Sequence, residues 1–516
     1  MEKNVPENFS GMLDLRNSGF FEAHFRVEGF LVTIIPFTEE CLGYIKMLDV
    51  YESDEYKHSK TITWVFGVDE RGRSVAFSKK NRVCKSIVSP ITLNAATFVT
   101  GVIVTTKSPV LADISSFDSI EFAGETIDLL YPPTSALVYN RENAAISFKN
   151  KKDYTKTYKL EINEEHMNID FSINTRYSWN ISKAPDLREE IKSFIKLSFD
   201  GAKPLEAIAA YYGYIMSLCE FCIRQRNLSL EITLNKKYEH KVNNGKSEIL
   251  NEKIFVKFFD GHDDYAHEKI EYCMDLNFRN LGDRLPYLFK LLSEKNTKPN
   301  LLYLPYRNID SNSINHTMIT DLCASIEREY GFIFGNPSNN SDANCSQFGA
   351  KMLHRELKAI VKNFKHKNKI DNITREKALN LIGKLKNSEP SFKEKSGKLY
   401  NLFKDYIKPI AEDIIQIPYD FNDPSKVKKY RQGTVYDEKE FKKIVGIFYA
   451  TRSRASHGLI VWDESSMSVY KYLELIVYFC ILYRAGYELD ECQNLLKPIF
   501  RKYFYNPEKE ELIDEC

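Results

Sequence analysis

The sequence contains no apolar run long enough to suggest a membrane span. Its longest such run, residues 475–483, is less than half of the roughly 20 residues that a transmembrane helix needs. Residues 1–11 also lack the basic and then apolar pattern of a secretory signal. We therefore expect a cytoplasmic protein that does not associate with a membrane.

Motifs for a metal or a cofactor are also lacking. The 10 cysteines are scattered, and only Cys219 and Cys222 form a CxxC pair. No second CxxC or close histidine pair accompanies them, as a zinc site would require. The pair lies in an apolar helical pattern, where buried free thiols are common. Because a glycine-rich phosphate loop, a nucleophilic serine triad and a carboxylate cluster are missing as well, the sequence predicts structural thiols, no metal and no cofactor.

The chain has almost no net charge. Its 72 Lys and Arg against 71 Asp and Glu give a formal charge of +1, so only local patches can indicate a nucleic-acid partner. A hydrophobic content of 43% is ordinary for a globular protein. Since 516 residues exceed what one core normally holds, we expect several domains.

Residues 1–180 predict a β-rich N-terminal domain. Residues 61–66 and 74–77 are β-forming runs on either side of a glycine-containing turn. Residues 167–173 alternate apolar and polar side chains, as a half-buried strand does. Recurring turn signals favour a sandwich-like domain or an open barrel.

Residues 181–312 predict a small α/β region. Residues 187–197 look helical, and residues 204–226 begin with proline and continue with apolar side chains at helical spacing. Residues 228–234 and 253–259 read as strands.

Residues 313–516 predict an all-α helical bundle, which makes the whole chain an α+β multidomain protein. Residues 419–436 read as a polar loop between two of its helices. The segments with helical periodicity are 318–330, 346–365, 375–387, 391–415, 438–451, 466–489 and 491–505.

The candidate catalytic pair, Arg452 and His457, follows the helix predicted at 438–451. An arginine can bind a phosphate through two parallel hydrogen bonds, and a histidine can transfer protons near neutral pH. Five residues correspond to about 140° around a helix, so the two side chains do not share a face. Either the helix ends before His457, or the long arginine reaches round, or two copies of the motif meet across a dimer. A helix end near Gly458 would favour protonated histidine.

Basic residues surround this pair in the sequence. Residues 351–400 carry far more Lys and Arg than Asp and Glu, which is typical either of a face that binds an RNA backbone or of a solvated helix surface. Candidate substrate-binding residues nearer the pair are Lys428, Lys429, Arg431, Lys442, Lys443, Ser453 and Arg454.

Arg452-x4-His457, late in a helical region, resembles the RxxxxH motif of HEPN ribonucleases. The front of the chain resembles the ApeA group of bacterial anti-phage proteins. Many HEPN motifs carry Asn, Asp or His directly after the arginine, whereas this chain has Ser453. The residues that carry the front resemblance are Phe9-Ser10-Gly11, Trp64-Val65-Phe66-Gly67, Asp69-Glu70-Arg71-Gly72, Ser74-Val75 and Pro204-Leu205-Glu206-Ala207.

The resemblance implies a metal-independent RNA endonuclease that acts in abortive infection, with tRNA as a candidate substrate. It implies a homodimer in which both motifs face one cleft. It also implies attack of the RNA 2′-hydroxyl on the adjacent phosphate, with His457 transferring protons and Arg452 stabilising charge. The β-rich domain would then sense a phage-derived trigger or restrain the nuclease.

Two alternatives remain open at this point. The helical domain could be a non-catalytic HEPN-type module that binds RNA or a nucleotide, or that only dimerises. The β-rich domain could be a carbohydrate or peptide binder carried on a helical scaffold.

Overall fold

The computed structural model divides the chain into two compact units, Met1–Arg279 and Asn280–Cys516. The division differs from the boundaries expected at 180 and 312, because strands that follow residue 180 belong to the same sheet as those before it. The structure describes residues 5–15, 18–38, 40–41, 64–79, 96–107, 114–140, 145–174, 191–225, 228–241, 247–258, 276–301, 316–335, 355–361, 374, 376–379, 390–411, 414–418, 427–431, 437–455 and 464–500.

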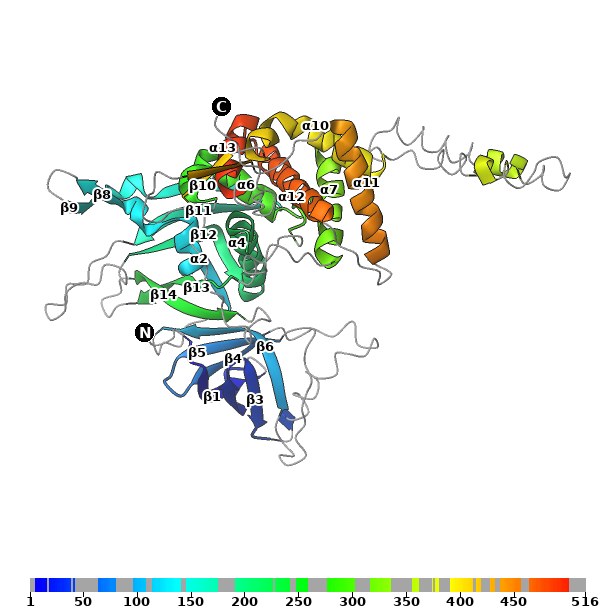
Figure 1. The fold of residues 1–516 in the computed structure, drawn as a ribbon. Coiled ribbons are helices and arrows are strands. Elements are labelled where there is room, and N and C mark those ends of the chain that lie inside the picture. The colour runs from blue at the N-terminus through cyan, green and yellow to red at the C-terminus, as the bar shows by residue number, and fades with distance from the viewer. Residues whose placement is uncertain are drawn as a thin grey trace. The chain divides into compact units, whose positions relative to one another are not determined.

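The first unit is built on a 12-stranded antiparallel sheet with a separate two-stranded hairpin, β8–β9 (Figure 1). Its helices are α2 (Glu125–Leu130) and α4 (Ile208–Ile223). Its strands are β1 (Asn8–Asp14), β2 (Ala23–Glu28), β3 (Leu31–Pro36), β4 (Trp64–Asp69), β5 (Ser74–Lys79), β6 (Ala96–Thr106), β7 (Ser116–Ala123), β8 (Leu137–Asn140), β9 (Ala145–Phe148), β10 (Lys156–Ile162), β11 (Glu165–Asn174), β12 (Lys192–Pro204), β13 (Glu231–Lys241) and β14 (Ser247–Phe258).

The first six strands close into a barrel. Their order is β6-β3-β2-β1-β4-β5, and β5 pairs again with β6. Phe9, Phe25 and Phe77 fill the interior, with ring centroids 5.1–6.3 Å apart. Strand β6 also pairs with β14, so the barrel continues into the open sheet β14-β13-β7-β12-β11-β10. Of the two predicted forms, the structure therefore contains a barrel rather than a sandwich, and this barrel is one end of a continuous sheet.

Two glycines of the front sequence motifs let β1 and β4 approach closely. A Cβ atom on Gly11 would lie 2.1 Å from the carbonyl oxygen of Val68, and one on Gly67 would lie 2.3 Å from that of Met12. Nearby, the Asp69 carboxylate accepts hydrogen bonds from the Arg71 and Arg73 amides and tightens the β4–β5 turn. These motifs therefore have a structural explanation in the barrel.

The open sheet buries one of its faces beneath helices. The predicted alternation at 167–173 is confirmed, because Ile169 and Phe171 of β11 are fully buried. Tyr211 of α4 stacks on Phe199 of β12, with the ring centroids 4.6 Å apart. Helix α4 confirms most of the helix expected at 204–226. The helix expected at 187–197 is wrong from Lys192 onward, since this segment pairs with β11 and β7 and alternates in burial along β12.

Cys219 and Cys222 lie on α4 as free, fully buried thiols. Burial raises the pKa of both thiols above the ordinary value, so neither is prepared for reaction near neutral pH. Their environment is that of structural cysteines.

The second unit is mainly helical (Figure 1). Almost every side chain of its helix α12 is buried between Val469 and Leu482, so other helices surround α12. Among the described residues, no helix combines the length and apolar character needed to cross a membrane. The helices are α5 (Phe278–Leu281, at the junction of the units), α6 (Leu285–Ser293), α7 (His316–Phe334), α10 (Phe392–Ala411), α11 (Glu438–Ala455), α12 (Glu464–Arg484) and α13 (Leu489–Phe500).

Two segments of this unit differ from prediction. The helix expected at 391–415, with a kink or break near Pro409, ends at Ala411 just after that proline, so only its last residues were wrong. Strands β15 (Ile414–Pro418) and β16 (Val427–Arg431) then form a hairpin inside the region read as helix and loop. The unit is therefore not all-α, because β-forming residues at 414–418 find a pairing partner that local periodicity does not reveal.

A buried ion pair joins α12 to α7. Both carboxylate oxygens of Glu329 accept hydrogen bonds from Arg484 at 2.7 Å, and the Glu329 side chain is fully buried. The guanidinium also donates to the Thr297 carbonyl and lies 3.7 Å from the centre of the Phe332 ring. Burial raises the pKa of Glu329, while Arg484 opposes that shift. The carboxylate therefore depends on its arginine to stay ionised.

Replacing Gly11 by alanine should destabilise the barrel by about 1–3 kcal/mol, because the new methyl group meets backbone atoms that cannot move freely. Gly201→Ala is the matched control, since a Cβ atom there meets no atom within 4 Å. Chemical denaturation followed by tryptophan fluorescence, to which the buried Trp64 of β4 contributes, measures both variants. Equal midpoints for the two variants would contradict the close approach of β1 and β4.

Replacing Arg484 by methionine should cost about 3–5 kcal/mol of folding free energy, because it leaves the Glu329 carboxylate buried without its partner. The double variant Glu329→Leu/Arg484→Met should recover most of that loss, since neither buried charge remains. Thermal and chemical denaturation compare the single and double variants. A single variant as stable as the wild type would show that the pair is not buried as described.

Candidate functional site

Helix α11 carries the arginine of the candidate pair. Its first turn is closed by Asp437, whose carboxylate accepts a hydrogen bond from the Glu440 amide at 2.7 Å. Phe441, Val445 and Phe448 form a fully buried stripe at spacings of four and three residues. This stripe explains why residues 438–455 fold as one amphipathic helix.

Helices α10 and α11 run antiparallel, as two aromatic stacks show. Phe441 stacks on Tyr400 with ring centroids 4.0 Å apart, and Tyr449 stacks on Phe392 at 4.7 Å. Because Phe392 begins α10 and Tyr449 lies three residues before Arg452, the last turn of α11 lies beside the first turn of α10.

The helical register separates the two arginines of the motif. Position 452 follows Val445 by seven residues, or about two turns, so it falls on the same side of the helix as the buried stripe. Position 454 follows Lys443 by eleven residues, or about three turns, and Lys443 is exposed. Position 453 falls between these two faces. The helix is described as far as Ala455, and His457 lies outside the described residues.

The first turn of α10 adds its own charges beside this end of α11. The Ser391 amide and hydroxyl both donate to Glu394 Oε2 at 2.7 Å, which forms a capping box. These hydrogen bonds, and more weakly Lys393 and Lys442, lower the pKa of Glu394. The region therefore combines an ionised carboxylate with basic side chains.

Lys393 is a basic residue that sequence reasoning did not single out. A Cβ atom on Gly446 of α11 would lie 3.8 Å from Lys393 Cδ, so this exposed lysine reaches across to α11. Its place in the basic region 351–400 was the only available signal, because its proximity to α11 depends on how the helices pack.

Lys442 and Lys443 have different surroundings. Lys442 Nζ lies 2.6 Å from Glu438 Oε1, and its side chain packs where a Cβ atom on Gly397 would clash with it. Lys443 is exposed. Of these two candidate substrate-binding residues, Lys443 is the more accessible to a ligand.

The basic residues Lys428, Lys429 and Arg431 lie on strand β16 rather than in a loop. Their backbones pair with Ile417, Gln416 and Ile414 of β15. Since side chains alternate along a strand, positions 429 and 431 share one face and position 428 takes the other. The three positions therefore do not lie on one side of the strand.

Within the part of the chain that the structure describes, no group of three or more His, Cys, Asp or Glu side chains is placed to hold a metal ion.

Comparisons of the chain with protein-family models, with curated proteins and with solved structures find no match.

The different surroundings of Lys442 and Lys443 can be measured by lysine labelling. An acetylating reagent should modify Lys443 faster than Lys442, as read by mass spectrometry of the folded protein. Glu438→Gln should speed labelling at Lys442 alone and cost about 0.3–0.5 kcal/mol, the usual value of an i,i+4 ion pair. Equal labelling of both lysines in the wild type would contradict the ion pair.

Proposed function

We propose that the chain is a metal-independent endoribonuclease of the HEPN type, with Arg452 and His457 as its catalytic residues. The observation that supports it best is the place of position 452 in the last turn of α11, beside the first turn of α10 and, by helical period, on the same side of α11 as Phe441, Val445 and Phe448. A purely solvated charge would be expected on the exposed face, where position 454 lies.

The proposed reaction needs only groups of the protein and the RNA. The 2′-hydroxyl oxygen attacks the neighbouring phosphorus, the bond from phosphorus to the 5′-oxygen breaks, and a 2′,3′-cyclic phosphate and a 5′-hydroxyl result. His457 transfers the proton that leaves the attacking hydroxyl or the proton that the departing 5′-oxygen requires. Arg452 stabilises the extra negative charge on the pentacovalent phosphate.

A dimer would complete the site. Because residues five apart along a helix do not share a face, a second copy of the motif could supply the histidine to the arginine of the first. This arrangement agrees with the resemblance to HEPN ribonucleases, in which two motifs face one cleft. Lys443, Lys393 and Arg454 would then bind the RNA backbone around the cleft.

We further propose that cleavage serves abortive infection against phage, with tRNA as a candidate substrate, and that the β-rich unit responds to a phage-derived trigger. The resemblance of the front of the chain to ApeA proteins motivates this part of the proposal. The alternative is a non-catalytic helical module that binds RNA or dimerises.

The purified protein should cleave RNA in the presence of EDTA. His457→Ala and Arg452→Ala should each reduce the rate by about 10²-fold or more, because each removes proton transfer or transition-state charge stabilisation. Arg454→Ala is the matched control within the motif, and it should weaken RNA binding without abolishing cleavage. Gel analysis of end-labelled RNA measures all three.

Two outcomes would contradict the proposed catalytic residues or the proposed mechanism. Cleavage by both catalytic variants at the wild-type rate would show that the pair has no catalytic role. Cleavage of an RNA with a single 2′-deoxy substitution at the cut site would contradict attack by the 2′-hydroxyl. Phage protection that persists in a His457→Ala strain would favour the non-catalytic alternative.

A further inference from the structure

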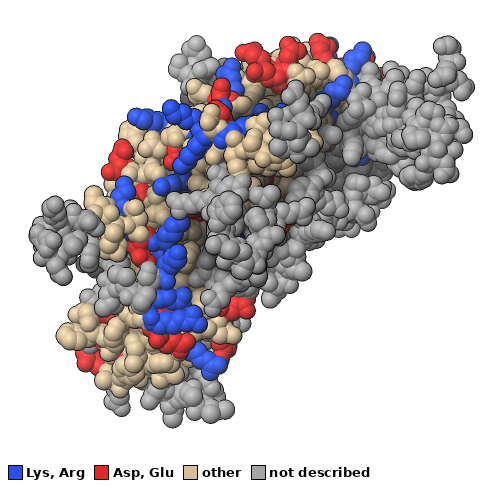
Figure 2. Space-filling view, turned by 90° about the vertical axis from the view of Figure 1, so that its left-hand side faces the viewer, with Lys and Arg blue, Asp and Glu red and all other residues tan. Residues whose placement is uncertain are grey.

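The open sheet of the first unit has two faces of opposite chemistry. Ile120, Ile195 and Ile232 belong to the face that packs beneath helices, and each is at most 3% exposed. Because side chains alternate along each strand, the intervening residues form the other face. That face is mostly polar, although Phe194 and Phe255 also belong to it. Helices α2 and α4 contact the opposite face, through Ser193 and Phe258. The surface drawn in Figure 2 carries a band of Lys and Arg side chains with Asp and Glu beside it.

One row of this polar face crosses all six strands without a carboxylate or a large apolar side chain. Register pairs Lys159 with Asn168, Asn168 with Ser198, Ser198 with Ser119, Ser119 with Asn235, and Asn235 with Lys253. We call these six residues the polar row. Five steps of roughly 4.8 Å give it a length of about 24 Å.

The polar row is exposed at its two ends and sheltered in its middle. Lys159 and Lys253 are exposed, whereas Ser119 is 5% exposed and accepts a hydrogen bond from the Asn235 side chain at 3.3 Å. The ends of the row therefore offer positive charge, and the half-buried Asn168, Ser198 and Asn235 offer amide and hydroxyl groups between them.

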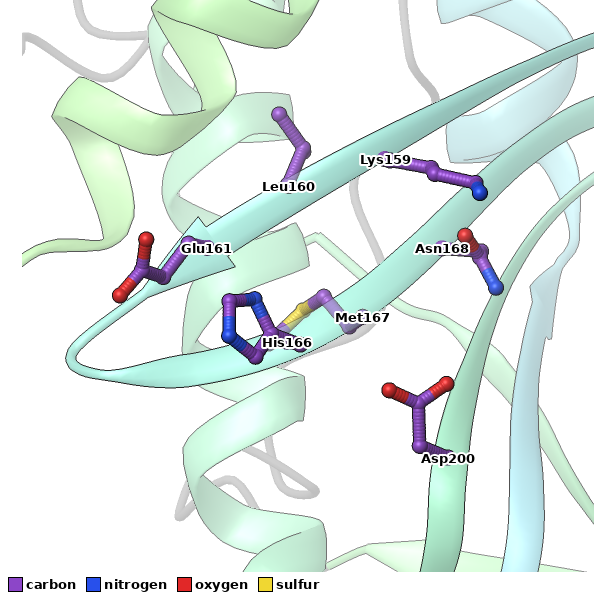
Figure 3. Close-up of a pocket in the computed structure, with 7 residues that line it drawn as sticks. All are labelled: Lys159, Leu160, Glu161, His166, Met167, Asn168 and Asp200. Carbon is purple, nitrogen blue, oxygen red and sulfur yellow. The ribbon is translucent and has the colours of Figure 1, made fainter.

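A hollow of about 360 Å³ lies at the β10–β11 end of the polar row. Figure 3 shows Lys159, Asn168 and Asp200 projecting from three neighbouring strands, with His166 nearby. This volume falls in the range of pockets that hold small ligands. The hollow thus combines an imidazole ring, an amide and carboxylates beside a lysine.

We propose that this face binds single-stranded RNA along the polar row, with one base in the hollow. His166 stacks on that base, and Asn168 and Asp200 bind its edge. Because carboxylates accept hydrogen bonds, the hollow selects a base that carries an amino group, such as cytosine or adenine. Lys159 and Lys253 bind phosphates at the two ends.

Charges of both signs lie on this face, and Lys159 itself has the carboxylates of Glu161 and Asp200 beside it in the hollow. In the next row, Lys196 lies between Asp170 and Glu121 in register. Lys192 Nζ lies 3.5 Å from Glu231 Oε1. A protein partner fits less well, because the polar row has no large apolar or aromatic side chain to act as an anchor. A neutral glycan would leave both lysines without a partner.

Binding can be tested with the full-length protein and fluorescent 2′-O-methyl oligonucleotides of cytosine, adenine or uracil. The proposed nuclease chemistry cannot cleave these, so the outcome does not depend on cleavage. Fluorescence anisotropy should show tighter binding of the cytosine and adenine oligomers than of the uracil oligomer. His166→Ala should weaken binding at least about fivefold through lost stacking. Asp200→Asn should remove the preference over uracil.

The salt dependence of binding tests whether Lys159 and Lys253 each contact a phosphate. Lys159→Ala and Lys253→Ala should each reduce the slope of log affinity against log salt by about 0.7, the value for one phosphate contact on a single strand. Arg26→Ala is the matched control, since Arg26 is an exposed residue of β2, which β3 and β6 separate from β14 in the sheet. It should leave the slope unchanged.

Three results would overturn the proposal. The wild type could fail to bind any of the oligomers at low salt. The row variants could bind with wild-type affinity and slope, which would place the RNA elsewhere. A neutral oligosaccharide could bind this face without salt dependence, which would assign the face to a carbohydrate.

Discussion

Burial of helix α12 on every side is the constraint on which the helical unit depends. A helix that is apolar around its whole circumference is stable only when other helices surround it. Helices α7, α10, α11 and α13 all contact α12 and supply this cover. The cover fixes α11 against α10 through the Phe441–Tyr400 stack. The position of Arg452 at the end of α11 is thus a consequence of how α12 is buried.

The sequence predicted those elements whose apolar residues have one clear period. Strand β11 and helices α4 and α11 are of this kind, whereas α12 was predicted from its long apolar stretch. The prediction failed at β12, because the spacing of its apolar residues fits the period of a helix as well as that of a strand. Pairing with β11 and β7 makes this segment a strand. The prediction also failed at β15, whose partner β16 begins nine residues further on and lies in a segment read as a loop. The pairing of β5 with β6, which closes the barrel, is also long-range and cannot be read from the local pattern of apolar residues.

The candidate site shows the same division between local and long-range information. The helix that carries Arg452, and the place of this residue in its last turn, follow from the sequence, because they depend only on residues 438–455 and on helical periodicity. The difference between Lys442 and Lys443 does not, since it depends on Gly397 of another helix. Functionally, the proposed nuclease residues and the proposed RNA-binding row belong to different units. One unit could therefore select an RNA and the other could cleave it.

The most direct measurement of the central claim is sequencing of RNA ends from cells that express the wild type or His457→Ala. Libraries prepared to capture 2′,3′-cyclic phosphate ends report the chemistry together with the cleavage position. The proposed mechanism predicts new cyclic-phosphate ends at defined positions in the wild type and their absence in the variant. The same new ends in both strains, or new ends that carry a 3′-hydroxyl, would contradict cleavage by Arg452 and His457.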